Sequence, residues 1–308
     1  MKRNLILSGK IVVSFFLLIY LFNKTDIVNI LSAMKSARIP LLILSFSLIS
    51  VGFILSSLRW KILLDAQNIR ISMWKLTKYY LVGSFFNNFL PTTIGGDIFR
   101  TYEVSKSSGS MTQSFAIIMV ERLTGIFALI VYSILGLQIG YSTFGNFLMV
   151  WVAGSVFIIS MIILILGVRL QGGVLKENTN TNIFSKARSM INKVLYTIYL
   201  YKDKKKVLFK ALILGFILQF NVIIFFYLIS CSLDLKPQFY YFLIIIPLIH
   251  IILMFPVSIN GIGIRENIFI FFLSKIGVCA ATSVAVSWLA FGMVLIYAVF
   301  GGIIYAFK

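Results

Sequence analysis

Two short polar motifs interrupt an otherwise apolar chain, and both combine residue types that bind anions. Each has a proline, a glycine five positions later and an arginine nine positions after the proline: Pro91, Gly96 and Arg100 in the first, Pro256, Gly261 and Arg265 in the second. A helix broken at such a motif presents free backbone N–H groups where its next segment starts, and a neighbouring guanidinium can hold phosphate with two parallel hydrogen bonds. The motifs therefore predict recognition of a phosphate-bearing headgroup, such as that of a phospholipid or a prenyl phosphate, rather than of a sugar or an inorganic cation.

The composition places these motifs in a membrane protein. Of the 308 residues, 60% are apolar and 12% are charged, and the mean hydropathy is +0.99. Soluble proteins have about 45–50% apolar and about 25% charged residues. The composition therefore excludes water-soluble enzyme folds and predicts an all-α polytopic membrane protein, with residues 1–308 forming a single integral membrane domain.

Helices that span a bilayer need about 20 mostly apolar residues. Six segments qualify and are predicted as full spans: 5–22, 41–58, 115–137, 148–168, 207–229 and 283–305. Two further apolar stretches, 79–90 and 240–256, are short and run directly into the two motifs. A separate stretch from Ile27 to Met34 has apolar residues at helical spacing, which predicts an amphipathic helix at the membrane interface.

The distribution of Lys and Arg predicts which side of the membrane each segment faces. Cytoplasmic loops are rich in these residues, and the sequence is basic before the first span, at 59–78 and most strongly at 169–206. Both termini and loop 169–206 are therefore predicted to be cytoplasmic, in a protein of the cell membrane. Segment 185–206 of this loop is predicted to form a surface helix on anionic lipid. With these assignments, segment 79–100 starts and ends on the cytoplasmic side of the membrane, whereas segment 240–277 starts and ends on the outer side. Each segment therefore either dips into the membrane and returns or crosses it as two half-helices.

The two motifs have matching surroundings. Each is preceded and followed by a full span, so units 41–137 and 207–305 have the same order of segments and opposite predicted orientations. Such inverted repeats are typical of transporters, whose substrate site lies where the repeats meet. We therefore predict about six full spans plus two broken or re-entrant helical hairpins that form an inverted repeat. The alternative is that both motifs are ordinary Pro/Gly loops between spans.

Two charged residues, Glu121 and Arg122, lie inside a predicted span. A charge at mid-bilayer costs about 2.5–3.5 kcal/mol on insertion scales. We therefore expect both side chains to face the protein interior and to contact Asp97, Arg100 or a headgroup. The alternative is that the span begins near Leu123 and leaves both residues at the cytoplasmic interface.

Other residues beside the spans receive simpler interpretations. Arg265 and Glu266 are expected to face the protein interior on the outer side of the membrane, as Glu121 and Arg122 are on the inner side. The run Arg59-Trp60-Lys61 directly follows a predicted span and is predicted to be an interfacial anchor. His250 lies in an apolar run and is predicted to be a hydrogen-bonded core histidine.

The remaining composition argues against several functional classes. The net charge of +19 would suggest nucleic acid in a soluble protein, but no basic soluble domain is long enough to form a groove, so no nucleic-acid partner is predicted. Cys231, Cys279 and the single histidine lack the spacing of metal ligands, so neither a metal nor another cofactor is expected. Walker and H-E-x-x-H motifs are absent from the sequence, which gives no support to an ATP-driven pump or a zinc protease.

Three ordered motifs, at 88–100, 121–125 and 256–266, resemble the transmembrane region of the lysylphosphatidylglycerol synthases, a family of flippase-like membrane proteins. The resemblance covers about residues 5–305. It implies a membrane module that moves an aminoacylated phospholipid between leaflets, whereas a separate soluble domain of the bacterial synthases transfers lysine from charged tRNA. We expect a stand-alone member without that soluble domain, and such members are also linked to other lipids, including polyprenyl-linked glycans.

The expected function is movement of an anionic or aminoacylated phospholipid, or of a polyprenyl-phosphate-linked lipid, between leaflets. The chain is not expected to be an enzyme. The alternative is a phosphatidylglycerol lysyltransferase, or a membrane subunit of such a lipid-modifying enzyme, with Glu121 or Asp97 as general base. A third hypothesis is a non-transporting scaffold in a glycolipid pathway. Membrane lipids are the expected partners. The protein assemblies to test for are a homo-oligomer and a complex with a lipid-modifying enzyme.

The motifs and the resemblance together predict a set of substrate-binding residues, with no catalytic and no metal-binding residue among them. They are Asn88, Pro91, Thr92, Thr93, Gly95, Gly96, Asp97, Arg100, Glu121, Arg122, Pro256, Ser258, Asn260, Gly261, Gly263, Arg265 and Glu266.

Overall fold

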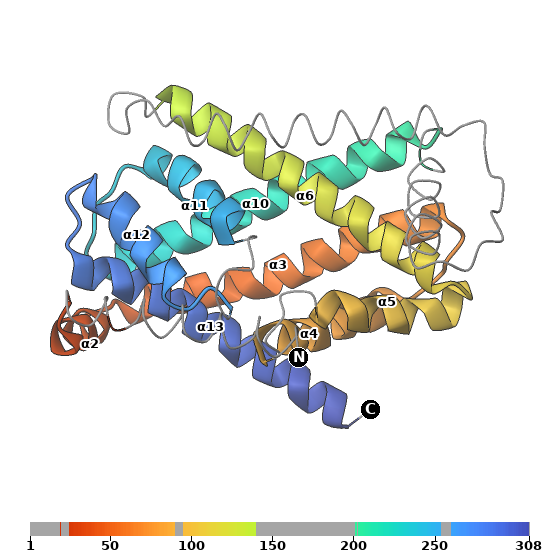
Figure 1. The fold of residues 1–308 in the computed structure, drawn as a ribbon, viewed down its shortest axis with the longest axis horizontal. Helices are drawn as coiled ribbons and strands as arrows, with labels where there is room; N and C mark the ends of the chain where they lie inside the picture. Colours follow the sequence, from red (N-terminus) through yellow and green to blue (C-terminus); the bar gives the residue numbers. More distant parts are fainter. Residues whose placement is uncertain are drawn as a thin grey trace, which may run out of the picture.

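In a computed structural model of the chain, the residues described are 25–89, 95–139, 203–253 and 260–307, together with Ile19 and Tyr201. Within these ranges the protein has nine helices and no strand, which confirms the predicted all-α fold (Figure 1). In chain order the helices are α2 (Ile27–Lys35), α3 (Ile39–Ala66), α4 (Met73–Phe89), α5 (Gly95–Ser108), α6 (Met111–Ile139), α10 (Lys205–Ser232), α11 (Phe239–Leu253), α12 (Ile264–Ser274) and α13 (Ala280–Ala306).

Four of these helices, α3, α6, α10 and α13, are long and apolar enough to cross a membrane, with mean hydropathies of 2.0 to 2.5 over their most apolar stretches. They contain the predicted spans 41–58, 115–137, 207–229 and 283–305. The protein therefore has the polytopic membrane architecture that the composition predicts. The predicted spans 5–22 and 148–168 lie outside the described residues apart from Ile19, and so does loop 169–206 apart from Tyr201 and residues 203–206.

Helix α3 is longer than the span predicted for it, because it continues past residue 58 to Ala66. Trp60 has no exposed surface and Arg59 is 7% exposed, so the prediction of an interfacial anchor is wrong for these two residues. Trp60 instead belongs to a cluster of buried apolar side chains that includes Leu63 and Leu76. Lys61 is partly exposed and pairs with Asp65 one turn later, at 2.7 Å.

Each polar motif separates a pair of shorter helices. The first pair is α4 and α5, and the second is α11 and α12. Residues 90–94 and 254–259, which connect the members of each pair, lie outside the described residues. Before α12, Asn260, Gly261 and Gly263 have φ angles of 53°, 76° and 82°. This left-handed turn suits glycine and asparagine, which lack the branched side chains that clash there.

The predicted amphipathic segment forms helix α2. The Asp26 carboxylate accepts a hydrogen bond from the Val28 N–H at 2.9 Å, which caps the helix start. Ile30 is fully buried, whereas Ile27 and Val28 are exposed, so α2 has one face against the protein and one facing outward. It packs against α13.

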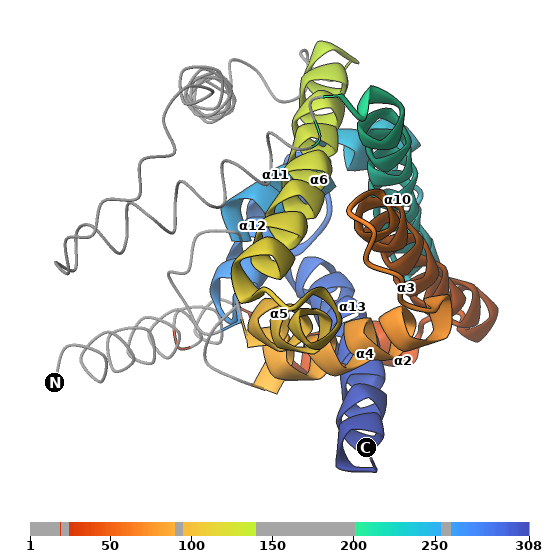
Figure 2. The same ribbon diagram turned by 90° about the vertical axis from the view of Figure 1, so that its right-hand side faces the viewer.

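The helices of the two predicted units, 41–137 and 207–305, pack against each other in corresponding pairs. Helix α3 packs against α10, α4 packs against α13, and α6 packs against α11. Each unit therefore places its first short helix against the last long helix of the other unit. Figure 1 shows α6 crossing over α3 and α10, and Figure 2 shows α3 and α10 side by side. The opposite orientation of the units in a membrane stays a prediction.

Glycines allow the closest of these helix contacts. A Cβ atom on Gly301 of α13 would collide with the carbonyl group of Leu81 on α4. A Cβ atom on Gly96 of α5 would likewise collide with the Gly83 carbonyl oxygen of α4. Small residues let helix backbones approach closely, which is how van der Waals packing holds helices together in a membrane. The α4–α13 and α4–α5 contacts therefore depend on these positions lacking a side chain.

Replacing Gly301 with alanine is expected to destabilise the protein, because the α4 and α13 backbones must separate to admit the methyl group. Overpacking of this kind costs about 1–3 kcal/mol. The matched control is Gly292→Ala in the same helix, where a Cβ atom would meet nothing within 4 Å. Thermal unfolding of both variants in mild detergent measures the difference. Equal midpoints for the two variants would contradict the close contact.

Candidate functional site

A buried carboxylate on α6 joins four helices. Glu121 is 2% exposed and forms an ion pair with Arg59 of α3, with an Nη2–Oε1 distance of 3.0 Å. Its other oxygen, Oε2, pairs with Nη2 of Arg100 on α5, and the hydroxyl of Tyr80 on α4 donates to Oε1. A charge placed this deep needs partners within the protein, and Glu121 has three.

A second carboxylate extends the network. Asp97 of α5 is 3% exposed and accepts a hydrogen bond from Nη1 of Arg100 at 3.4 Å. It also forms an ion pair with Arg122 of α6, whose side chain is 39% exposed. We call the set Arg59, Asp97, Arg100, Glu121 and Arg122 the ionic cluster. It holds three guanidinium groups against two carboxylates, so a single positive charge is in excess.

The ionic cluster confirms the expectation that Glu121 and Arg122 contact Arg100 and Asp97. The alternative, that the span begins near Leu123 and leaves both residues at the cytoplasmic interface, stays a prediction; the structure shows Glu121 buried among its partners. Helix α6 begins ten residues earlier, at Met111. Arg122 is the partly exposed member of the ionic cluster.

Aromatic rings complete the surroundings of Arg100. Its guanidinium carbon lies 4.1 Å from the centre of the Trp60 ring and 3.8 Å from that of the Tyr80 ring. Cations are attracted to the faces of such rings. A Cβ atom on Gly83 would lie 3.3 Å from Arg100 Cδ, so this glycine leaves room for the arginine stem. Arg100 is therefore held on its faces and at both terminal nitrogens.

Arg265 of the second motif has different partners from Arg100 of the first. Nη2 of Arg265 donates to the carbonyl oxygen of Asn260 at 2.8 Å, and its guanidinium lies 4.4 Å from the centre of the Phe291 ring. No Asp or Glu of the described residues forms an ion pair with it. The neighbouring Glu266 accepts the Gly263 N–H at 2.7 Å and the Ser287 hydroxyl at 3.3 Å. Glu266 therefore caps the start of α12 rather than pairing with Arg265.

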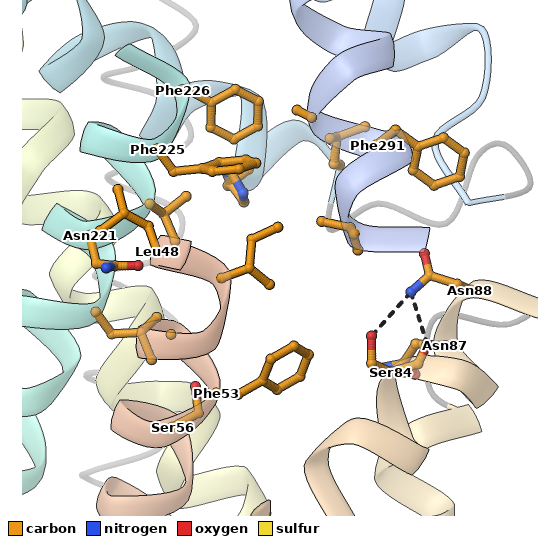
Figure 3. Close-up of a pocket in the computed structure, with 18 of the residues that line it drawn as sticks. Leu48, Phe53, Ser56, Ser84, Asn87, Asn88, Asn221, Phe225, Phe226 and Phe291 are labelled. Carbon is orange, nitrogen blue, oxygen red and sulfur yellow. Dashed lines mark hydrogen bonds between the residues drawn. The ribbon is translucent and has the colours of Figure 1, made fainter. Parts of the chain in front are cut away.

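The two motifs touch through asparagine side chains. Nδ2 of Asn260 donates to the backbone and side-chain oxygens of Asn88, both at 3.2 Å. Nδ2 of Asn88 in turn donates to the Ser84 carbonyl oxygen at 2.8 Å (Figure 3). The adjacent Asn87 accepts the Gly96 N–H at 2.7 Å and thereby caps α5. Side chains that are 172 positions apart in the sequence thus link the two broken helices.

A cavity of about 500 Å³ lies between the two units. Residues of α3, α4, α5, α10, α11, α12 and α13 line it, and both Arg100 and Arg265 are among them. Figure 3 shows Leu48, Phe53 and Asn221 on one side and Asn87, Asn88 and Phe291 on the other. Most of the wall is apolar, with Phe53, Phe225, Phe226, Phe269 and Phe291 providing aromatic surface. Ligand sites commonly have this character, an apolar wall with a few polar groups.

His250 of α11 also lines the cavity. Its Nδ1 is hydrogen-bonded to the Ile246 carbonyl oxygen at 2.9 Å, in agreement with a hydrogen-bonded histidine in an apolar helix. Among the described residues, no group of three or more His, Cys, Asp and Glu side chains could hold a metal ion.

The structure divides the predicted site residues into three groups. Asp97, Arg100, Glu121 and Arg122 meet in the ionic cluster, and Asn88, Arg100 and Arg265 line the cavity. Gly95, Gly96, Asn260, Gly261, Gly263 and Glu266 shape the starts of α5 and α12. Pro91, Thr92, Thr93, Pro256 and Ser258 lie outside the described residues.

Sequence reasoning missed four residues of this region. Arg59, Trp60 and Tyr80 surround Arg100 and Glu121, and Asn87 caps α5. The available signal for Arg59 was its position at the end of an apolar run, which also fits an interfacial residue. Nothing in the local spacing distinguishes Asn87 from Asn88.

Comparisons with known proteins agree with this architecture. The model of a family described as "Lysylphosphatidylglycerol synthase TM region" matches residues 7–302. A UPF0104 membrane protein of Pyrococcus horikoshii is 24% identical over 311 residues, which cover 94% of this chain and 92% of that protein. A UPF0104 membrane protein of Methanothermobacter thermautotrophicus is 28% identical over 250 residues, which cover 75% of this chain and 74% of that protein.

Removing the charge of Glu121 is expected to destabilise the protein far more than removing a surface carboxylate. Glu121→Gln leaves the buried Arg59 and Arg100 without their shared partner, a loss that costs about 3–5 kcal/mol. Asp65→Asn breaks only the partly exposed pair with Lys61, which is worth about 0–1 kcal/mol. Thermal unfolding in detergent compares the two variants. A Glu121→Gln midpoint no lower than that of Asp65→Asn would contradict the bridging role of Glu121.

Proposed function

The chain belongs to the lysylphosphatidylglycerol synthase TM-region family, and on that premise we propose that this membrane protein moves a phosphate-bearing lipid between leaflets. The lipid is a phospholipid or a polyprenyl-phosphate-linked lipid. The observation that carries the proposal is the cavity between the two broken-helix units. Both motif arginines and Asn88 line it, and the rest of its wall is largely apolar and aromatic.

The distribution of strong interactions supports a transport mechanism in which the two units move against each other. The ionic cluster lies wholly within α3, α5 and α6, and it holds unit 41–137 together. The contacts from this unit to unit 207–305 are of another kind. Within the two ranges they are apolar packing and neutral hydrogen bonds, such as Asn260 to Asn88 and Tyr132 to the Phe216 carbonyl oxygen at 3.2 Å. At the helix ends, Arg38 directly before α3 forms an exposed ion pair with Asp234, and Lys204 directly before α10 donates to the Ala66 carbonyl oxygen. Neutral hydrogen bonds contribute little net free energy, typically about 0.5–1.5 kcal/mol each, so the units can separate at low cost.

In this mechanism the cavity is the central binding site and opens to each side in turn, as in other inverted-repeat transporters. The ionic cluster remains intact while the units rock. The contact between Asn88 and Asn260 breaks and reforms, because it joins the two moving parts. Arg265 lies on the second unit and therefore moves relative to the ionic cluster.

The ionic cluster weakens the case for a transferase. Glu121 and Asp97 are the carboxylates that would serve as general base. Each is bound to two arginines, and neither lines the cavity. A general base must lie within hydrogen-bond reach of the proton that it accepts. Formation of lysylphosphatidylglycerol by the purified chain from aminoacyl-tRNA and phosphatidylglycerol would nevertheless favour the transferase over transport.

Filling the cavity without changing any charge is expected to stop lipid movement. Gly52 of α3 lines the cavity, and a Cβ atom there would lie at an ordinary contact distance, 3.6 Å, from Asn221 Oδ1. Gly52→Phe therefore fits at the backbone and places its ring in the cavity. Translocation of fluorescently labelled phospholipids in proteoliposomes should fall to near the rate of protein-free vesicles.

The matched control is Gly292→Phe on α13, which adds the same ring where a Cβ atom has open space and which does not line the cavity. This variant should translocate lipid like the unchanged protein. Both variants are first checked for an unchanged elution profile and melting temperature. Lipid translocation that is the same for Gly52→Phe and Gly292→Phe would contradict a transport path through the cavity.

A further inference from the structure

We propose that the cavity selects a lipid whose headgroup is a singly charged phosphodiester without an ammonium group, and that Arg265 is the residue that holds it. The expected ligand is therefore of the phosphatidylglycerol type, rather than an aminoacylated phospholipid or a polyprenyl pyrophosphate. This inference takes the cavity as a lipid site, and to that extent it rests on the proposed function.

The two arginines that line the cavity differ in their partners. The terminal nitrogens of Arg100 are bound to Asp97 and Glu121, and two aromatic rings cover its faces. Its guanidinium is already paired with carboxylates of the protein. Arg265 contacts the Asn260 carbonyl oxygen and the Phe291 ring, and the neighbouring Glu266 interacts with its charge without forming an ion pair. Arg265 supplies the cation on the cavity wall whose charge no carboxylate pairs with, and its remaining N–H groups are available to phosphate oxygens.

The acidic residues of the described ranges lie away from the cavity wall. Of the nine Asp and Glu in the sequence, only Glu177 falls outside the described residues. None of the other acids lines the cavity. Those in ion pairs are Asp65, Asp97, Glu103, Glu121 and Asp234, Asp26 and Glu266 cap helices, and Asp203 is exposed.

An ammonium group would therefore find no carboxylate on the described cavity wall, and Arg265 would repel it. A desolvated cation without an anionic partner is strongly disfavoured in such an environment. The Asn, Ser and aromatic side chains of the wall suit hydroxyl groups and acyl chains instead. A glycerol headgroup offers hydroxyls and no cation, which fits these polar partners.

The single charge of Arg265 also limits how much negative charge the headgroup can carry. Arg265 is the guanidinium on the described cavity wall that forms no ion pair with a carboxylate, which matches the one negative charge of a phosphodiester, whereas a pyrophosphate carries more negative charge than Arg265 can offset. The volume of about 500 Å³ holds a headgroup with the first part of its acyl chains, within the usual range of about 300–1,000 Å³ for ligand sites. The phenylalanine side chains of the wall then face the chains.

Native mass spectrometry of the purified full chain tests the proposal. The protein is equilibrated with an equimolar mixture of phosphatidylglycerol, lysylphosphatidylglycerol and phosphatidylcholine, and the lipid retained by each protein ion is measured. Phosphatidylglycerol should be retained about tenfold more than either other lipid, because all three offer the same phosphodiester to Arg265 and only the other two bring an ammonium group that finds no carboxylate. Arg265→Gln should reduce phosphatidylglycerol to the level of phosphatidylcholine, and Arg265→Lys should keep part of the preference because the charge remains.

The control variant is Lys75→Gln, which removes one exposed positive charge on α4 that does not line the cavity, and it should retain phosphatidylglycerol normally. Millimolar glycerol 3-phosphate should not displace the lipid, because the acyl chains contribute to binding. Retention of lysylphosphatidylglycerol equal to or above that of phosphatidylglycerol would overturn the proposal. So would undiminished phosphatidylglycerol retention by Arg265→Gln, or displacement by glycerol 3-phosphate.

Failure of this inference is distinguishable from failure of the proposed function. If vesicles with the protein translocate no lipid but phosphatidylglycerol is retained through Arg265, the transport proposal fails and the headgroup assignment stands. If lipids are translocated irrespective of headgroup and of Arg265, transport stands and the headgroup assignment fails. Melting temperatures of both Arg265 variants accompany the measurement, so that loss of binding is not confused with loss of folding.

Discussion

The buried carboxylate of Glu121 is the constraint on which the rest of the described architecture depends. An ionised group inside a membrane protein is tolerated only when oppositely charged partners surround it, and Glu121 obtains them from Arg59 and Arg100. Both partners need space. A Cβ atom on Gly125 of α6 would lie 3.3 Å from Arg59 Nη1, and one on Gly215 of α10 would lie 3.5 Å from it. The glycines of α4, α6 and α10 thus leave room for the guanidinium groups, and the ion pairs fix how α3, α5 and α6 pack.

The same constraint separates the roles of two motifs that look equivalent in sequence. Arg100 and Arg265 have the same offset from their prolines, but α5 begins at Gly95 whereas α12 begins at Ile264. Arg100 is therefore the sixth residue of its helix and Arg265 the second. Asp97 precedes Arg100 by one helical turn and Glu121 reaches it from α6, whereas an isoleucine, Ile262, stands where Asp97 would be in the second motif. One arginine consequently stabilises the fold, and the other is left for a ligand.

The sequence predicts the helices well and the contacts between them poorly, for physical reasons. A helix in a bilayer must be apolar along its length, so hydropathy locates α6, α10 and α13 to within a few residues. The end of α3 is missed because Arg59 ends an apolar run, and the carboxylate that allows the helix to continue is 62 positions away. The motif spacing predicts Arg100 and Arg265 as substrate-binding residues, and the family resemblance adds Asn88; all three line the cavity. Neither identifies Asn87 or Tyr80, whose roles arise only when α4 packs against α5 and α6.

The most direct test of the account is an experimental structure of the full chain purified with its native lipids, at a resolution that shows headgroups. The account predicts lipid phosphate in the cavity within hydrogen-bond distance of Arg265, with Arg100 still bound to Glu121 and Asp97. The acyl chains would lie along the phenylalanine side chains of the cavity wall. Lipids confined to the outer surface of the helices, with only water in the cavity, would contradict the account, and so would a phosphate bound to Arg100 in place of Glu121.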